Sequence, residues 1–160
     1  MTKVKIVGVG RARGPIADAI ADYETRAQRY FSFSSAEVRE ESCRGPADVG
    51  RVKTQEGERL LARAGDATQL VALHRGGNLW TSGQFARYLA DAIAQAGPGV
   101  AFLIGGAFGL ADSVIASAAH RVSLSGCTLP HELARLVLTE QLYRAGTITR
   151  GEPYHKGTVE

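Results

Sequence analysis

The segment VAFLIGGAFGLADSV, residues 100–114, joins an apolar run to three glycines and the start of a helical pattern. Continuous apolar character over residues 100–104 is typical of a strand buried on both faces, as in the middle of a parallel sheet. Because glycine has no side chain, Gly105, Gly106 and Gly109 predict either a loop that approaches a ligand or a tight turn that needs glycine for its dihedral angles alone. The segment therefore predicts a central parallel strand with a glycine turn at its carboxyl end.

Alternating strand and helix patterns extend from this segment in both directions. Strand patterns cover residues 3–10, 36–42, 68–74 and 120–124, and helical patterns cover residues 15–30, 48–64, 82–96 and about 130–146. Thr81 and Gln84 predict a capping box, residues 75–78 predict a turn, and the last helix is expected to bury Leu133, Leu136 and Val137. Strands that alternate with helices predict an α/β fold, a mainly parallel sheet flanked by helices, in a single domain of residues 1–160.

The composition is that of an ordinary globular protein, with 44% hydrophobic and 22% charged residues. A net charge of +3 is compatible with a polyanionic partner but does not identify one. Cys43 and Cys127 form no CxxC or Cys/His ligand pattern, so we expect two thiols in a reducing compartment and no zinc site. No apolar segment has the length of a signal peptide or a membrane span, so we expect a cytoplasmic protein with no membrane partner.

The glycine turn excludes two common kinds of nucleotide site. GGAFGLAD lacks the lysine and the following serine or threonine of a Walker phosphate loop. GxGxxG is also absent and the strand is the fourth rather than the first, so a dinucleotide fingerprint, and with it a nicotinamide oxidoreductase, is disfavoured. A strand end whose backbone groups hold a neutral or cationic cofactor remains, beside the simple tight turn.

Four motifs follow one another along the chain. They are VALHRGG (residues 71–77), FLIGGAFGL (102–110), LSGCTLPHELARLVLTEQLYR (124–144) and RGEPYHK (150–156). Taken together they make the sequence, over nearly its whole length, similar to the ribosomal RNA large subunit methyltransferase H family, a small bacterial branch of the SPOUT, or α/β-knot, methyltransferases. The resemblance implies a C-terminal trefoil knot, a rare feature that periodicity and spacing do not reveal.

The resemblance also implies a cofactor site in the knot, where S-adenosylmethionine is held as methyl donor and no metal is needed. The residues expected to line this site are Leu73, Gly105, Leu124, Ser125, Gly126, Cys127, Thr128 and Leu129. Leucines suit the apolar walls around adenine, and glycine lets backbone groups reach its edge. Cys127 is expected to be a small apolar wall residue rather than a nucleophile that uses His131 as its base.

The reaction that the resemblance implies is methylation of ring nitrogen N3 of a pseudouridine in helix 69 of 23S rRNA, in the assembled ribosome, by a homodimer. Basic and aromatic residues late in the chain suit such a substrate, because rings stack on unpaired bases and cations neutralise phosphates. The residues expected to be catalytic are Arg144, Tyr154 and His155, with His155 handling the N3 proton, and those expected to bind RNA are Arg135, Arg150 and Lys156. Two alternatives stay open: an ion pair of Arg144 with Glu140, and a frayed chain end.

This chain departs from the family pattern after the first two glycines of the turn. Ala107 and Phe108 stand where a proline or serine is followed by a glutamate or asparagine. Phe108 removes a polar side chain near the expected site of methyl transfer, and we expect it to alter packing or substrate contact rather than cofactor binding. A SPOUT methyltransferase with a different RNA target, or an RNA-binding module that has lost activity, therefore remains as an alternative.

Overall fold

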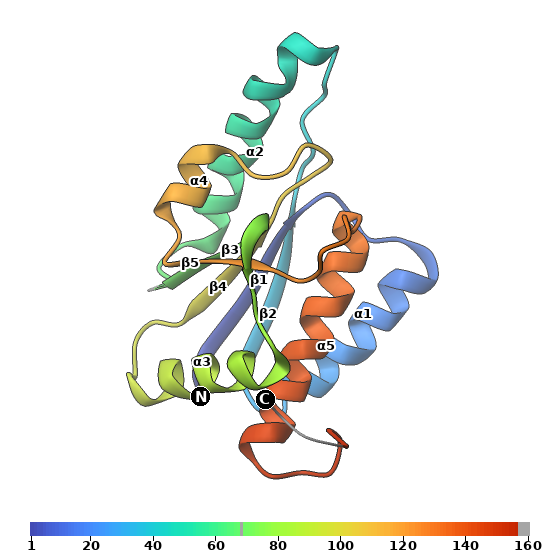
Figure 1. Cartoon of the computed structure of the whole chain (residues 1–160). Coiled ribbons are helices and arrows are strands. Elements are labelled where there is room, and N and C mark those ends of the chain that lie inside the picture. The colour runs from blue at the N-terminus through green and yellow to red at the C-terminus, as the bar shows by residue number, and fades with distance from the viewer. Residues whose placement is uncertain (68, 157–160) are drawn as a thin grey trace.

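The computed structural model describes residues 1–67 and 69–156. Its elements in chain order are β1 (Lys3–Val9), α1 (Gly14–Ala27), β2 (Ser32–Val38), the short 3-10 helix η1 (Pro46–Asp48), α2 (Val49–Ala64), β3 (Gln69–Leu79), α3 (Ser82–Ala94), β4 (Val100–Ile104), α4 (Asp112–Ser117), β5 (His120–Ser123) and α5 (His131–Thr149) (Figure 1). Strands and helices alternate as the sequence predicts. Thr68, the first residue of the third predicted strand, lies outside the described residues.

The five strands form one sheet in the order β2-β1-β4-β3-β5, and every pair of neighbours runs parallel. β4 lies in the middle, and all five of its residues are buried. The predicted mainly parallel sheet flanked by helices is therefore confirmed. Because the strands are parallel, the segments that follow β1, β4, β3 and β5 all leave the sheet at one edge, where ligands of such sheets bind.

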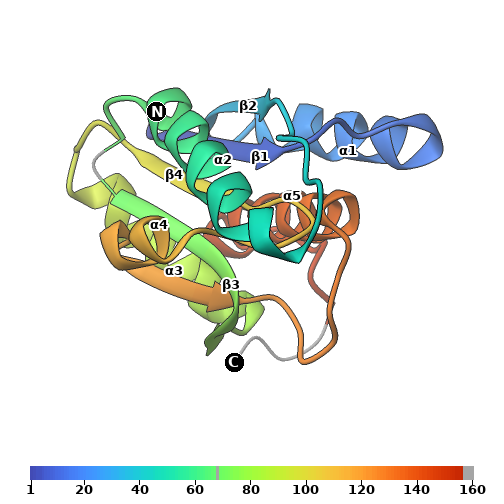
Figure 2. The same ribbon diagram turned by 90° about the horizontal axis from the view of Figure 1, so that it is seen from above.

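Helices cover both faces of the sheet (Figures 1 and 2). On one face α1, α3 and α5 bury an apolar cluster that includes Phe85, Leu138 and Leu142. On the other face α2 and α4 bury a second cluster that includes Leu60 and Val114. Within the two described ranges, no helix has the length and apolar content needed to cross a membrane.

The start of α3 and the end of α5 can be compared with the helix ends predicted from the sequence. The capping box of α3 is confirmed, since the Thr81 amide donates to Gln84 Oε1 (2.7 Å) and the Gln84 amide donates to Thr81 Oγ1 (3.2 Å). The last helix is longer than predicted and continues through Gly146 to Thr149. Gly146 lies inside this helix because it packs against the ring of Tyr30, where a Cβ atom would overlap the ring. Glycine here serves close packing rather than helix termination.

The buried face of α5 differs from the predicted one. Leu133 and Val137 are 37% and 36% exposed, and Leu136 is only partly buried, whereas Leu138 and Leu142 are fully buried. The prediction was wrong because apolar residues occur almost all round this helix, so the sequence pattern does not select one face. The consequence is an apolar strip on the outside of α5.

The edge strand β2 begins four residues earlier than predicted and ends at Val38 rather than residue 42. Among the described strands its one neighbour is β1, and the two strands pair in register from Lys3 with Ser32 to Val9 with Val38. Because an edge strand has a partner on one side only, its length is set by that partner rather than by its own composition. The buried Phe33 fixes the early part of β2 on the core.

β3 continues through the predicted turn at residues 75–78 and ends at Leu79. Its pairing with β5 breaks between Leu73 and Asn78, both of which pair with Val122. Gly77 lies so close to the β5 backbone that a Cβ atom on it would come within 2.6 Å of the Arg121 carbonyl carbon. The end of β3 therefore crosses the start of the connection from β5 to α5 (Figure 1).

Candidate active site

A cavity of about 440 Å³ opens at the carboxyl edge of the sheet, where β3, β4 and β5 end. Pockets of this size hold small-molecule ligands in other proteins. Seven of the eight residues predicted to hold the cofactor line it: Leu73, Gly105, Leu124, Ser125, Cys127, Thr128 and Leu129. Gly126, the eighth, lies in the same loop but does not line the cavity. The fold thus brings together three segments that are far apart in the sequence.

The glycines after β4 form a tight turn that is also part of the cavity wall. The Gly109 amide donates to the Gly106 carbonyl (3.1 Å), and Gly109 has a φ of +81°, which side chains disfavour. A Cβ atom on Gly105 would lie 2.6 Å from the Gly109 carbonyl carbon and 2.8 Å from the Leu110 amide nitrogen. The turn therefore requires glycine at these positions, and the same residues form part of the cavity wall.

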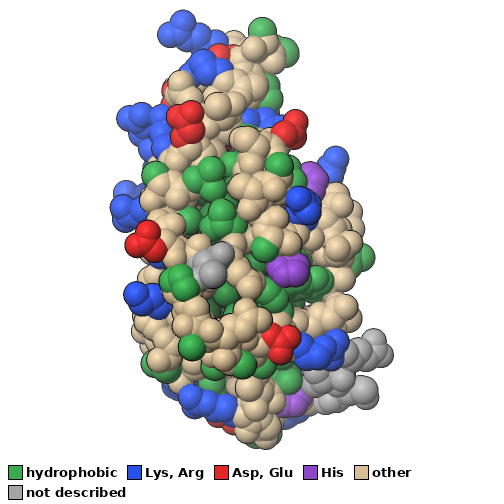
Figure 3. Space-filling view, turned by 90° about the vertical axis from the view of Figure 1, so that its left-hand side faces the viewer, with side chains coloured by type: hydrophobic (Ala, Val, Ile, Leu, Met, Phe, Trp, Pro, Cys, Tyr) green, Lys and Arg blue, Asp and Glu red, His purple; other side chains and the backbone are tan. Residues whose placement is uncertain are grey.

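Polar side chains surround the apolar part of the cavity. They come from α2, the end of β3, α4 and the start of α5, and they are Lys53, His74, Arg75, Asp112 and His131. Across the opening, Arg75 Nη1 donates to Thr128 Oγ1 (2.9 Å) and so links the end of β3 to the loop before α5. Figure 3 shows that Lys and Arg side chains on the α2–α4 side of the molecule are scattered rather than gathered in one patch.

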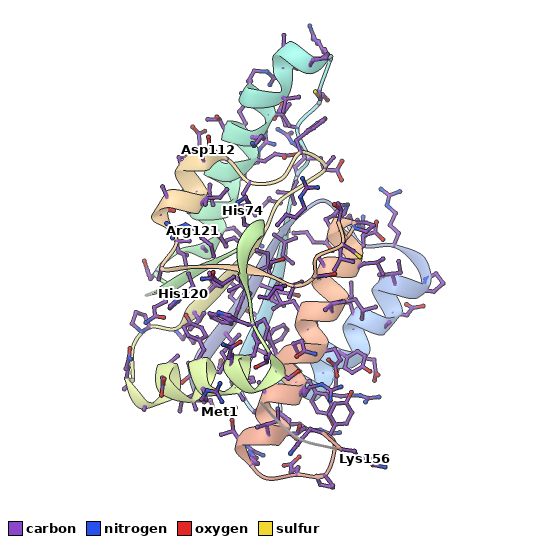
Figure 4. All side chains as sticks on the ribbon, in the orientation of Figure 1. Met1, His74, Asp112, His120, Arg121 and Lys156 are labelled. Carbon is purple, nitrogen blue, oxygen red and sulfur yellow. The ribbon has the colours of Figure 1, made fainter. Side chains whose placement is uncertain are left out.

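The C-terminal residues lie at the opposite end of the molecule from this cavity. α5 begins at the cavity with His131 and, at 19 residues, spans about 28 Å. In Figure 4, His74 and Asp112 lie in the half of the molecule that holds the cavity, and Lys156 lies at the far end. None of Arg144, Tyr154 and His155 lines the cavity.

Glu152 and Tyr154 of the C-terminal segment are held against α5: the Glu152 amide donates to the Thr147 carbonyl (2.9 Å), and Tyr154 contacts side chains of the helix. Tyr154 donates to Glu140 Oε1 (3.0 Å), and its ring lies 4.6 Å from the ring of Tyr143. Burial, together with its hydrogen bonding to Tyr23 and Glu140, raises the pKa of Tyr154. Arg144 Nη2 donates to the same Glu140 oxygen (2.6 Å), and the Arg144 guanidinium lies 5.0 Å from the centre of the Tyr154 ring. The ion pair considered for Arg144 is present, and it also supports the tyrosine.

His155 follows Tyr154 in the chain, but within the described part of the chain one of its ring nitrogens lacks a hydrogen-bond partner. Among the described residues, its Nδ1 atom is buried and has no hydrogen-bond partner. A buried polar atom without a partner costs free energy, so such an atom often has a functional reason.

The three cations predicted to bind RNA lie in different surroundings. Arg135 is only 12% exposed and donates to Glu37 Oε1 (2.6 Å) and Glu24 Oε1 (3.1 Å), so it joins α5 to α1 and β2. Arg150 is exposed and lies 4.6 Å from the centre of the Tyr30 ring. Lys156 is exposed near the end of the described chain. Arg135 is thus engaged within the protein, whereas the other two reach its surface.

Residues 2–155 match the family described as "Predicted SPOUT methyltransferase". The chain belongs to the SPOUT methyltransferases. It is 49% identical over 156 residues to the ribosomal RNA large subunit methyltransferase H of Gemmatimonas aurantiaca, an alignment that covers 96% of this chain and 99% of that protein. It is 39% identical over 160 residues to the protein of the same name from Desulfitobacterium hafniense, covering 98% and 100% of the two chains. The family resemblance predicted from the four motifs is confirmed.

The architecture of this SPOUT methyltransferase is shared with distant solved structures. A probable methyltransferase from Bordetella pertussis Tohama I superposes with a TM-score of 0.57 at 11% identity, over 90% of this chain and 96% of that chain. A probable methylase family protein from Haemophilus influenzae Rd KW20 superposes with a TM-score of 0.54 at 12% identity, over 98% and 72% of the chains. At these identities the likeness shows a common fold.

SPOUT methyltransferases use S-adenosylmethionine as methyl donor, and the lining of the cavity fits such a group. Leu73, Ile104, Leu124 and Leu129 supply apolar surface, and Gly105 contributes backbone to the wall. Apolar walls with a few fixed polar groups are typical of such pockets. In the parts of the chain that the structure describes, no group of three or more His, Cys, Asp or Glu side chains could hold a metal ion.

One buried acid near the site was not predicted from the sequence. Glu56 of α2 is 4% exposed; its Oε2 accepts from the Glu41 amide (3.1 Å), and among the described residues its Oε1 has no partner. That free oxygen faces the glycine turn, since a Cβ atom on Gly106 would lie 3.0 Å from it. Burial raises the pKa of Glu56. The signal was its spacing, four residues from the buried Val52 and Leu60, which places it on the apolar face of the helix.

Proposed function

We propose that this protein methylates ring nitrogen N3 of a pseudouridine in helix 69 of 23S rRNA, in the assembled ribosome, with S-adenosylmethionine as methyl donor. One observation carries the proposal: the fold gathers three separate segments of a family motif set around one cavity of suitable size and chemistry. The relatives' name, ribosomal RNA large subunit methyltransferase H, supports rRNA as the substrate class. Since ribosomes are the substrate, we expect the protein to work in the cytoplasm.

The chain's own contribution at the cavity is orientation and exclusion of water. When bound, S-adenosylmethionine supplies a methyl group that is already activated by a positively charged sulfur. Leu73, Leu124 and Leu129 would enclose the apolar part of the cofactor, and the Gly105 backbone would contact its edge. Holding two reactants in line is sufficient for a large part of the rate enhancement in such a transfer, and the proposal requires no metal ion.

A proton must leave ring nitrogen N3 when the new bond forms there. His155 is the proposed acceptor, as the family resemblance implies, and the lack of an Nδ1 partner among the described residues leaves its ring uncommitted to a structural hydrogen bond at that atom. Arg144 and Tyr154, fixed by their shared partner Glu140, would hold the base in position. Arg150 and Lys156 are the proposed phosphate contacts, whereas the Arg135 side chain serves the fold.

The distance between the cavity and the C-terminal residues supports a homodimer. Within one chain, α5 separates His155 from the cavity by most of its length, so these groups cannot act on the same nucleotide. A second copy in the opposite orientation would bring its C-terminal residues to the cavity of the first. The exposed Leu133 and Val137, close to the cavity on α5, are the proposed contact surface.

The same proposal includes the trefoil knot that the family resemblance implies. The end of β3 lies against β5, with Gly77 against the backbone of Arg121 and Val122. Arg75 and Thr128 hydrogen-bond between the end of β3 and the loop before α5. Both contacts are those expected where α5 has passed through a loop of the chain, within one domain of residues 1–160.

Ribosomes from cells that lack this modification provide the test. Purified protein is added with S-adenosylmethionine that carries a labelled methyl group, and the labelled nucleotide is mapped by mass spectrometry. The proposal predicts label at N3 of a helix 69 pseudouridine, with free 23S rRNA as a poorer substrate. Label on another RNA would indicate a SPOUT methyltransferase of different target. Ribosome binding without cofactor binding or label would indicate an RNA-binding module without activity.

A further inference from the structure

The cavity continues beyond the segments that would hold the cofactor. On the far side of the glycine turn it is lined by Lys53 of α2, by Asp112 and Ile115 of α4, and by Phe108 of the turn itself. We call this part the Phe108 lobe. None of these four residues belongs to the set expected to hold S-adenosylmethionine, and none has a role in the proposed transfer.

Phe108 is placed unusually for a large aromatic side chain. It is 44% exposed, yet its backbone is fixed, because the Gly109 amide donates to Gly106 and Gly105 packs against the Gly109 backbone. Because the turn fixes the Phe108 backbone, an exposed aromatic ring there loses little backbone entropy when a flat ligand binds against it. The ring is therefore a ready contact for a flat ligand that enters the cavity.

The charges of the lobe indicate what kind of flat ligand this is. Lys53 suits a phosphate, and Asp112 suits an N–H or a hydroxyl group, so the three side chains match the base, the phosphate and the ribose of a nucleotide. A free phosphate ion would be repelled by Asp112, and an apolar ligand would leave both charges without partners. Unpaired RNA bases bind proteins by stacking on aromatic side chains beside a cation.

We propose that Phe108 is a specificity-determining residue that stacks on an unpaired base of the rRNA substrate, at or beside the methylated nucleotide, while Lys53 contacts a phosphate of the same strand. This inference rests on the proposed function and adds the residues that read the substrate.

Variants of Phe108 test the inference through methyl transfer to unmodified ribosomes. Phe108→Ala is expected to raise the KM for ribosomes about 5- to 150-fold, the loss typical of one stacking contact, with kcat and the cofactor Kd within about twofold of wild type. Phe108→Trp keeps a stacking face and is expected to restore the KM. Phe108→Leu keeps apolar bulk but has no aromatic face, and it is expected to behave like Phe108→Ala.

Two further variants complete the set. Ile93→Ala, at a position of 42% exposure on α3 that does not line the cavity, is the matched control and is expected to leave the KM unchanged. Lys53→Gln is expected to reduce the slope of log KM against log salt concentration by about 0.7, the loss of one phosphate contact with a single strand.

Three results would overturn the inference: a wild-type KM for Phe108→Ala, a wild-type KM for Phe108→Leu, or a weakened cofactor Kd as the main effect of Phe108→Ala. The wild-type protein is assayed in the same series. If it does not label ribosomes, the proposed function fails and this inference fails with it. A wild-type KM for ribosomes in Phe108→Ala, beside an active wild type, contradicts the inference alone.

Discussion

Replacing Gly105 with alanine tests whether the glycine turn shapes the cofactor cavity. The added Cβ atom would lie 2.6 Å from the Gly109 carbonyl carbon, which is 0.8 Å short of the 3.4 Å at which ordinary contact begins. It would also lie 2.8 Å from the Gly109 oxygen and from the Leu110 nitrogen. All three neighbours are backbone atoms of a hydrogen-bonded turn, so the turn as a whole has to move.

The expected cost follows from that geometry. Forcing one extra methyl group into a packed site costs about 1–3 kcal/mol. If the turn relieves this strain by moving, cofactor binding has to restore the native position, and the Kd for S-adenosylmethionine is expected to rise about 5- to 150-fold. Isothermal titration calorimetry measures this Kd directly, and a thermal melt of the same sample shows whether the fold persists.

Gly126→Ala is the matched control for this prediction. Gly126 lies in the adjoining loop, does not line the cavity, and a Cβ atom on it would meet nothing within 4 Å. Its cofactor Kd is expected to stay within about twofold of wild type. The reasoning is refuted if Gly105→Ala binds cofactor as wild type does, or if both variants weaken binding equally.

Three further predictions concern side chains outside the turn. Arg135→Ala is expected to lower the free energy of unfolding by about 2 kcal/mol, because it leaves two carboxylates unpaired, but to leave the salt dependence of ribosome binding unchanged; a reduced salt slope with normal stability would contradict this. Burial raises the pKa of Glu56 above its ordinary value of 4.5, so the folded protein holds the Glu56 proton more tightly than the unfolded chain does. The stability that this proton contributes is complete below pH 4.5 and is lost as the pH rises through the raised pKa. Glu56→Gln cannot ionise, so its melting temperature relative to wild type should increase from about pH 4 to about pH 8, and a constant difference would show that Glu56 does not titrate there. Tyr154→Phe removes the hydrogen bond to Glu140 and should lower methyl transfer about tenfold at an unchanged cofactor Kd, and a changed Kd would argue against a role at the substrate.

Much of the fold was predictable because its strongest signals are local. The apolar run of Val100–Ile104 indicated a strand buried on both faces, and Thr81 with Gln84 indicated a helix start; both are as expected. The bounds of β2 were not predictable from its own residues, because they are set by pairing with β1. The exposed face of α5 was mispredicted because its apolar residues surround the helix.

The candidate site also has features that the sequence predicts and features that it does not. The motifs identified the cavity-lining residues, since motif and wall coincide at three strand ends. Sequence alone could not show that Arg135 is engaged by Glu24 and Glu37, which are about 100 residues away along the chain. Nor could it show that Lys156 lies at the far end of the molecule from His74 and Asp112, because that depends on the direction in which α5 runs along the sheet.

Activity of mixed dimers tests most directly the central claim, that one protomer's cavity and its partner's C-terminal residues form one active site. Gly105→Ala protein, with an impaired cavity, is mixed with His155→Ala protein, whose C-terminal residues are impaired, and the subunits are allowed to exchange before methyl transfer to ribosomes is measured. Half of the dimers would then be mixed, and each would carry one site with both parts intact. At a cofactor concentration below the wild-type Kd, where both separate variants are impaired, the account therefore predicts that these intact sites contribute about a quarter of wild-type activity. Activity no higher than the mean of the two separate variants would contradict it.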